Sequence, residues 1–89
     1  MLVKTIIIKN KLGLHARAAV KLMNLANRFV SSVKIEKDGS EVDGKSILGI
    51  LTLAAVHGSQ ITLKVSGKDE KSALKAMEIL IENKFQEEE

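Results

Sequence analysis

The sequence predicts an α/β (α+β) fold, an open-faced two-layer sandwich in which three helices cover one face of a four-stranded antiparallel sheet. Apolar and polar residues alternate over 33–36 and 61–66, and apolar residues recur at three- and four-residue steps over 16–28 and 70–84. Asp38-Gly39, between two alternating segments, is a strong signal for an antiparallel hairpin. The elements follow in the order βαββαβα, and only the helices can cover the apolar face of the sheet.

A strand and a helix open the chain. Residues 2–9 predict the strand, because three consecutive isoleucines lie at its centre. Turn-forming residues at 10–13 end this strand. Residues 16–28 then predict an amphipathic helix, whose apolar stripe consists of Ala19, Leu22, Met23 and Ala26.

A hairpin and a short helix form the middle of the chain. Val33 and Ile35 alternate with charged residues before the Asp38-Gly39 turn, and Val42 lies in the return strand. Ser46 can cap the next helix, predicted over residues 47–54, because a serine hydroxyl accepts a hydrogen bond from the first helical turn. The inward candidates on this helix are Ile50 and Leu53.

A fourth strand and a third helix complete the predicted fold. Residues 61–65 alternate between apolar and polar, and residues 70–84 carry the clearest helical stripe. No internal repeat or linker interrupts the sequence. We therefore expect residues 1–89 to form a single domain, with an acidic tail at about 86–89.

Composition limits the chemistry that is available. Aromatic residues make up 2% of the chain and hydrophobic residues 45%, so the core must be aliphatic. The absence of cysteine excludes disulfides and thiolate metal sites, and two histidines leave little for a metal, so no metal or cofactor is expected. No signal peptide or membrane span is predicted, which favours the cytoplasm and no membrane insertion.

The net charge of +3 is unevenly distributed. The first acidic residue is Glu36, and without the three final glutamates the chain carries 14 basic and 8 acidic residues, a net charge of +6. Such a surface suits an acidic partner, which leaves protein, membrane and nucleic acid open. A small basic nucleic-acid-binding domain is a remote alternative, because RNA-binding sheets usually display stacking aromatics and this chain has no Tyr or Trp.

The predicted start of the first helix offers a site for chemistry. The boundary residues His15 and Ala16 supply no conventional capping oxygen, so backbone N–H groups stay available and the helix dipole favours an anion there. An imidazole nitrogen is a competent phosphoryl acceptor, and Arg17 lies close by in the sequence. A lone histidine after a glycine turn is nevertheless more often an ordinary surface residue.

Two segments resemble the motifs of a known family. The run Gly13-Leu14-His15-Ala16-Arg17 resembles the active-site motif of HPr, the histidine-containing phosphocarrier family of the bacterial phosphotransferase system. Residues 42–51, which read Val-Asp-Gly-Lys-Ser-Ile-Leu-Gly-Ile-Leu, resemble the family's second motif around a regulatory serine. The order βαββαβα also matches the family fold, so the resemblance covers nearly the whole chain.

The resemblance implies a phosphoryl relay. His15 would accept a phosphoryl group at Nδ1 from Enzyme I, which takes it from phosphoenolpyruvate, and would pass it to an EIIA-type protein. Arg17 would steady the phosphate together with the open N–H groups. The protein would then be a carrier with a covalent phosphohistidine intermediate in sugar uptake, rather than an enzyme acting alone on a small substrate.

The resemblance also implies a regulated docking surface. Ser46 would be phosphorylated by a dedicated HPr kinase/phosphorylase in those bacteria that possess one. Exposure of Ile47, Leu48 and Leu51 is favoured, and these residues with Ala16 would dock the partner proteins. A carrier with two successive partners has reason to stay monomeric, so a monomer is expected.

One residue departs from the family pattern. Ala18 stands where the family commonly has proline. Alanine is a good helix former, so the helix should survive the change. The Ala18 form also resembles some NPr proteins, the nitrogen-related paralogues, which leaves a regulatory phosphotransfer pathway open as an alternative to sugar uptake.

Overall fold

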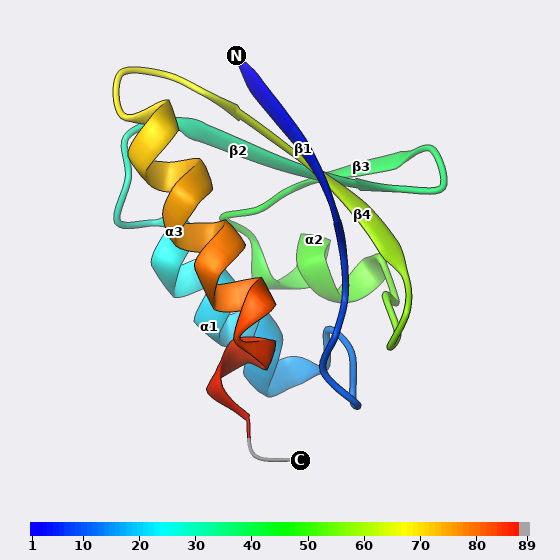
Figure 1. The fold of residues 1–89 in the computed structure, drawn as a ribbon. Coiled ribbons are helices and arrows are strands. Elements are labelled where there is room, and N and C mark those ends of the chain that lie inside the picture. The colour runs from blue at the N-terminus through cyan, green and yellow to red at the C-terminus, as the bar shows by residue number, and fades with distance from the viewer. Residues whose placement is uncertain (88–89) are drawn as a thin grey trace.

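The computed structural model describes residues 1–87, which form one antiparallel sheet with helices on one of its faces (Figure 1). The strands β1 (Leu2–Ile7), β2 (Ser32–Lys37), β3 (Ser40–Asp43) and β4 (Gln60–Ser66) lie side by side in the order β1-β4-β2-β3. The helices are α1 (Ala16–Ala26), α2 (Ile47–Thr52) and α3 (Glu70–Glu82), followed by the 3-10 turn η1 (Lys84–Gln86). The predicted fold class and element order are confirmed.

The strand register separates a buried face from an open one. In the cross-strand pairs Ile6 lies opposite Ile61 and Leu63 lies opposite Ile35, and all four side chains are buried. The neighbouring pair is polar, since the hydroxyls of Thr5 and Thr62 lie 3.2 Å apart on the other face. The alternation therefore places aliphatic side chains under the helices. The opposite face is mostly polar, although Val3 and Ile7 of β1 are exposed on it.

The Asp38-Gly39 hairpin is confirmed. Lys37 pairs with Ser40, so only two residues connect β2 to β3. Both connecting residues have positive φ, 50° for Asp38 and 85° for Gly39. Two such residues in a two-residue loop are typical of a type I′ turn, whose twist matches that of the flanking strands.

The helices end earlier than the periodicity predicts. α1 ends at Ala26 and α2 at Thr52, each two residues short of the predicted boundary. α3 ends at Glu82, because residues 84–86 all take positive φ and turn the chain away from the helix axis. Periodicity reports which face of a helix is apolar and is a poor guide to its last turn. No helix within residues 1–87 is long and apolar enough to cross a membrane.

The turn before α1 packs closely against the segment that precedes β4. Gly13 has a φ of +67°, and a Cβ atom there would lie 2.5 Å from the Ala55 carbonyl oxygen and 2.7 Å from the Val56 Cα. The next residue, Leu14, is buried and donates its N–H to the Ala55 carbonyl at 2.9 Å. Gly13 is therefore required both for its backbone conformation and for the close approach of two chain segments.

We predict that Gly13→Ala lowers the free energy of unfolding by about 3 kcal/mol, since it combines left-handed strain with a backbone clash. Gly58→Ala is the matched control, because Gly58 also has positive φ, at +87°, but has no atom within 4 Å of the added Cβ. The control should lose only about 1 kcal/mol. Urea unfolding of both variants measures the difference. Equal losses of unfolding free energy would contradict the close packing of Gly13 against residues 55–56.

Candidate functional site

The N-terminus of α1 is not capped by a side chain. His15 is the N-cap residue with extended backbone angles, φ −73° and ψ 176°, and it makes no side-chain capping bond. The first intrahelical bond runs from the Ala19 N–H to the His15 carbonyl at 2.8 Å. The N–H groups of residues 16–18 therefore precede the helical ladder and point out of the helix start, where the dipole favours an anion.

The two residues of the predicted phosphate site, His15 and Arg17, lie together at this helix start, with the predicted docking residue Ala16 between them. The His15 side chain is 25% exposed. Ala16 and Arg17 are exposed, and no described residue pairs with the Arg17 guanidinium. Ala18 is fully buried in the same turn, so the helix forms with alanine at the position where the family commonly has proline.

A carboxylate contacts the imidazole from the far end of the chain. The Nε2 atom of His15 is bonded to an Oε atom of Glu87. The other Glu87 oxygen accepts a hydrogen bond from the Asn10 amide nitrogen at 2.9 Å. The Glu87 side chain is only 8% exposed, so this carboxylate is an enclosed part of the site.

The Asn10 side chain ties the turn before α1 to this carboxylate. Asn10 is fully buried, and its amide nitrogen also donates to the Gly13 carbonyl at 2.7 Å. Both partners of the amide are acceptors, so the NH₂ group must face them and the amide orientation is determined. Burial alone would raise the pKa of Glu87, but the hydrogen bonds from Asn10 and His15 and the charges of His15 and Lys21 bring it below its usual value.

The path of the chain after α3 brings Glu87 to the site. Lys84, Phe85 and Gln86 adopt φ values between 56° and 61°, a left-handed turn that non-glycine residues rarely make. The side chain of Phe85 is fully buried, and its carbonyl accepts a hydrogen bond from the Lys21 ammonium on α1 at 2.6 Å. Burial of the aromatic ring and this bond offset the backbone strain of the turn.

The described part of the predicted acidic tail is therefore not a free extension. Gln86 belongs to η1, and Glu87 packs against His15. Glu88 and Glu89, the rest of the predicted tail, lie outside the described residues. Asn10 and Glu87 could not be predicted as site residues from the sequence, since neither belongs to a motif and their contact spans 77 positions.

Ser46 caps α2 as expected. Its hydroxyl accepts a hydrogen bond from the Gly49 N–H at 3.2 Å, and its carbonyl accepts the Ile50 N–H at 3.0 Å. The side chain is partly exposed, so it is not sealed into the core. Helix α2 packs against α1, which places the second motif on the element next to the His15 helix.

The apolar residues of α2 divide between core and surface. Ile50 and Leu53 are buried, as the sequence predicts. Leu48 is 73% exposed and Leu51 is 36% exposed, whereas Ile47 is partly buried against the core. Of the four predicted docking residues, Leu48 and Leu51 therefore offer large apolar side chains to solvent, Ala16 offers a small one, and Ile47 offers the least.

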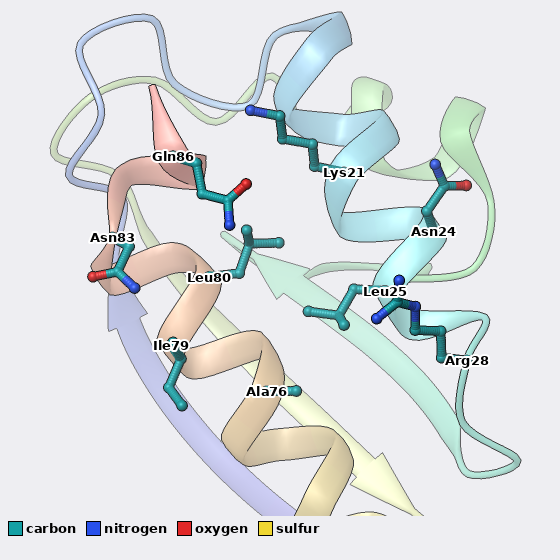
Figure 2. Close-up of a pocket in the computed structure, with 9 residues that line it drawn as sticks. All are labelled: Lys21, Asn24, Leu25, Arg28, Ala76, Ile79, Leu80, Asn83 and Gln86. Carbon is teal, nitrogen blue, oxygen red and sulfur yellow. The ribbon is translucent and has the colours of Figure 1, made fainter. Parts of the chain in front are cut away.

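A groove of about 360 Å³ lies between α1 and α3, away from the predicted phosphate site (Figure 2). Leu25 and Leu80 supply apolar lining, and the basic residues Lys21 and Arg28 lie on its α1 side. None of the predicted site residues lines it. The groove is thus a separate surface feature, and the open helix start lies outside it.

The open face of the sheet does not favour nucleic acid. Lys64 lies on this face, and its ammonium contacts Glu36 at 2.7 Å and Glu41 at 3.0 Å. The hydrogen bonds to these two carboxylates raise the pKa of Lys64. The lysine charge is therefore balanced by acidic neighbours, and the strands present no aromatic residue for base stacking. Within residues 1–87, no group of three or more acidic or histidine side chains could hold a metal ion.

Comparison with known proteins agrees with this arrangement. A family described as "PTS HPr component phosphorylation site" matches residues 2–83. The phosphocarrier protein HPr of Cupriavidus necator is 52% identical over 87 residues, which is 98% of this chain and 98% of that protein. The chain belongs to the HPr family of phosphocarriers of the phosphotransferase system.

Solved structures of the family share the fold. The crystal structure of HPr-C-His from Thermoanaerobacter tengcongensis has a TM-score of 0.96 at 46% identity and covers 100% of both chains. A structure of an HPr dimer from the same organism has a TM-score of 0.79 at 46% identity, covering 98% of this chain and 100% of that one. The sandwich fold described above therefore has experimental counterparts.

We predict that Ser46→Ala lowers the free energy of unfolding by about 1 kcal/mol, because the Gly49 N–H loses its capping acceptor. Ser46→Asn should restore most of this loss, since asparagine caps helices equally well. Thermal and urea unfolding check both variants. A Ser46→Ala protein as stable as the wild type would show that the cap contributes nothing.

Proposed function

We propose that this chain is the phosphocarrier of a phosphoenolpyruvate-dependent sugar phosphotransferase system, accepting a phosphoryl group on His15 from phospho-Enzyme I and passing it to an EIIA-type protein. The observation that carries the proposal is the imidazole of His15 at a helix start that lacks a side-chain cap. The relatives named phosphocarrier protein HPr support the sugar pathway over the nitrogen-related one.

The transfer exchanges one P–N bond for another. The lone pair of His15 Nδ1 attacks phosphorus while the bond from phosphorus to the donor's histidine breaks, and the electron pair of that bond returns to the donor. Because each partner holds the group in a similar bond, the step is nearly neutral in free energy and runs onward by the same chemistry. The N–H groups of residues 16–18 and the Arg17 guanidinium would bind the phosphoryl oxygens, as expected for a helix start.

The partners would dock on the exposed apolar residues of α2 beside the helix start. Leu48 and Leu51 supply apolar contact area, and Ala16 leaves room next to His15. The basic balance of the chain suits an acidic partner surface. Phosphorylation of Ser46 by an HPr kinase/phosphorylase would add a charge of about −1.5 to −2 at this surface and repel such a partner.

We also infer the setting in which this carrier works. It would act in the cytoplasm as a monomer, without a metal or cofactor, because each transfer needs one open His15 site and a partner that supplies its own histidine. Sedimentation of the purified protein measures its oligomeric state.

Incubation with phosphoenolpyruvate and Enzyme I tests the central proposal. We predict a mass gain of one acid-labile phosphate on the wild-type protein, and none on His15→Ala. His57→Ala is the matched control, because His57 is the other histidine of the chain and is exposed. Arg17→Ala should slow the gain about tenfold or more, through loss of a charged contact to the phosphate. Wild-type protein that gains no phosphate from a competent Enzyme I would overturn the proposal.

A second substitution pair tests the docking surface. We predict that Leu48→Glu raises the Michaelis constant of Enzyme I for this protein about tenfold, because it removes apolar contact and adds a like charge to an acidic interface. Val30→Glu is the control, since Val30 is 76% exposed against 73% for Leu48 but lies in the loop before β2. Equal effects of the two variants would contradict docking on α2.

A further inference from the structure

We propose that Glu87 is a positioning residue for phosphoryl transfer, whose carboxylate holds the proton on Nε2 of His15 so that the lone pair of Nδ1 is available to phosphorus. This inference rests on the proposed function and adds a residue to it. The family match ends at residue 83, so Glu87 lies beyond the segment that defines the family. The contact itself is the bond between Nε2 and the Glu87 carboxylate.

The chemistry of the contact determines which nitrogen carries the proton. An ionised carboxylate only accepts hydrogen bonds, so the ring nitrogen that it touches must be the donor. A neutral imidazole has a single N–H, and when that group is Nε2–H the other nitrogen, Nδ1, keeps its lone pair. The hydrogen bonds that lower the pKa of Glu87 keep it ionised at neutral pH.

The same contact favours the reaction as well as the starting tautomer. When Nδ1 bonds to phosphorus and the donor's P–N bond breaks, the ring retains its Nε2 proton and becomes cationic. The carboxylate already in contact with that proton stabilises the new positive charge, in the way that the aspartate of a Ser-His-Asp triad stabilises its imidazolium. On the onward transfer the electron pair returns to Nδ1 and the ring is neutral again, so no proton has to leave in either step.

The Glu87 carboxylate is enclosed and held in place, which strengthens its interaction with the His15 imidazole. Its side chain is 8% exposed, and a charge–charge interaction is stronger in such a site than in open water. Asn10 donates to its second oxygen, and the buried ring of Phe85 anchors the chain two residues before it. The carboxylate is thus held at Nε2, while the open N–H groups of residues 16–18 lie at the helix start.

The test compares the rate of phosphoryl acceptance in single-turnover reactions with phospho-Enzyme I. We expect Glu87→Gln to be about tenfold slower than wild type, because the amide retains the shape but loses the charge. Glu82→Gln is the matched control, since Glu82 pairs with Lys9 instead of His15, and it should react at the wild-type rate. A Glu87→Gln rate equal to wild type would overturn the inference, and a faster rate would do so by identifying Glu87 as a lid over the imidazole.

A spectroscopic readout tests the inference independently of phosphate. We expect ¹⁵N NMR of the imidazole to report the Nε2–H tautomer in the wild type, and a smaller share of it in Glu87→Ala. An unchanged tautomer distribution would overturn the positioning role. If the wild type gained no phosphate but showed the Glu87-dependent tautomer, the proposed carrier function would be wrong and the contact between Glu87 and His15 would be confirmed. If His15 gained phosphate and the Glu87 variants had no effect, the carrier function would be confirmed and the positioning role of Glu87 would be wrong.

Discussion

The hydrogen bond from the Leu14 N–H to the Ala55 carbonyl, made possible by the close approach of Gly13, is the interaction on which the site depends. A helix that begins without a capping side chain gives up about 1 kcal/mol of stability relative to one with a good cap. Tertiary contacts therefore have to define where α1 begins. The close packing of Gly13 against residues 55–56 and the burial of the Leu14 side chain define this start. They leave the first N–H groups of the helix free for a ligand.

The two helices that begin within the motifs, α1 and α2, differ in how the free N–H groups at their first turns are satisfied. In α2 the hydroxyl of Ser46 satisfies the Gly49 N–H, so this helix start is complete as it stands. In α1 the N-cap position is occupied by His15, whose side chain makes no capping bond and reaches Glu87 instead. A phosphoryl group on His15 would supply the negative charge and acceptor oxygens that the helix start lacks. The absence of a side-chain cap on α1 is thus what would allow this helix start to bind the phosphoryl group.

Much of this arrangement is predictable from the sequence, and for identifiable reasons. The alternation in β4, the stripe of α1 and the Asp38-Gly39 turn are local signals, and each predicted the observed element. The candidate phosphate site is likewise local, since His15 and Arg17 lie two positions apart at the start of one helix.

The contact with Glu87 could not be predicted in this way. It depends on three consecutive non-glycine residues in left-handed conformation, which is an intrinsically unfavourable choice that burial of Phe85 offsets. No local pattern signals a turn of that kind, so Glu87 read as part of an acidic tail. The same tertiary effect explains why α3 ends at Glu82 rather than continuing along its apolar stripe.

The most direct test of the account is a comparison of the backbone amide NMR spectra of the free and phosphorylated protein. If the phosphoryl group completes the start of α1, the amide protons of residues 16–18 should shift downfield on phosphorylation, because they become donors to a charged acceptor. The amides at the start of α3 should not move. Phosphorylation of His15 that leaves the amides of residues 16–18 unchanged would contradict the claim that the uncapped helix start holds the phosphate.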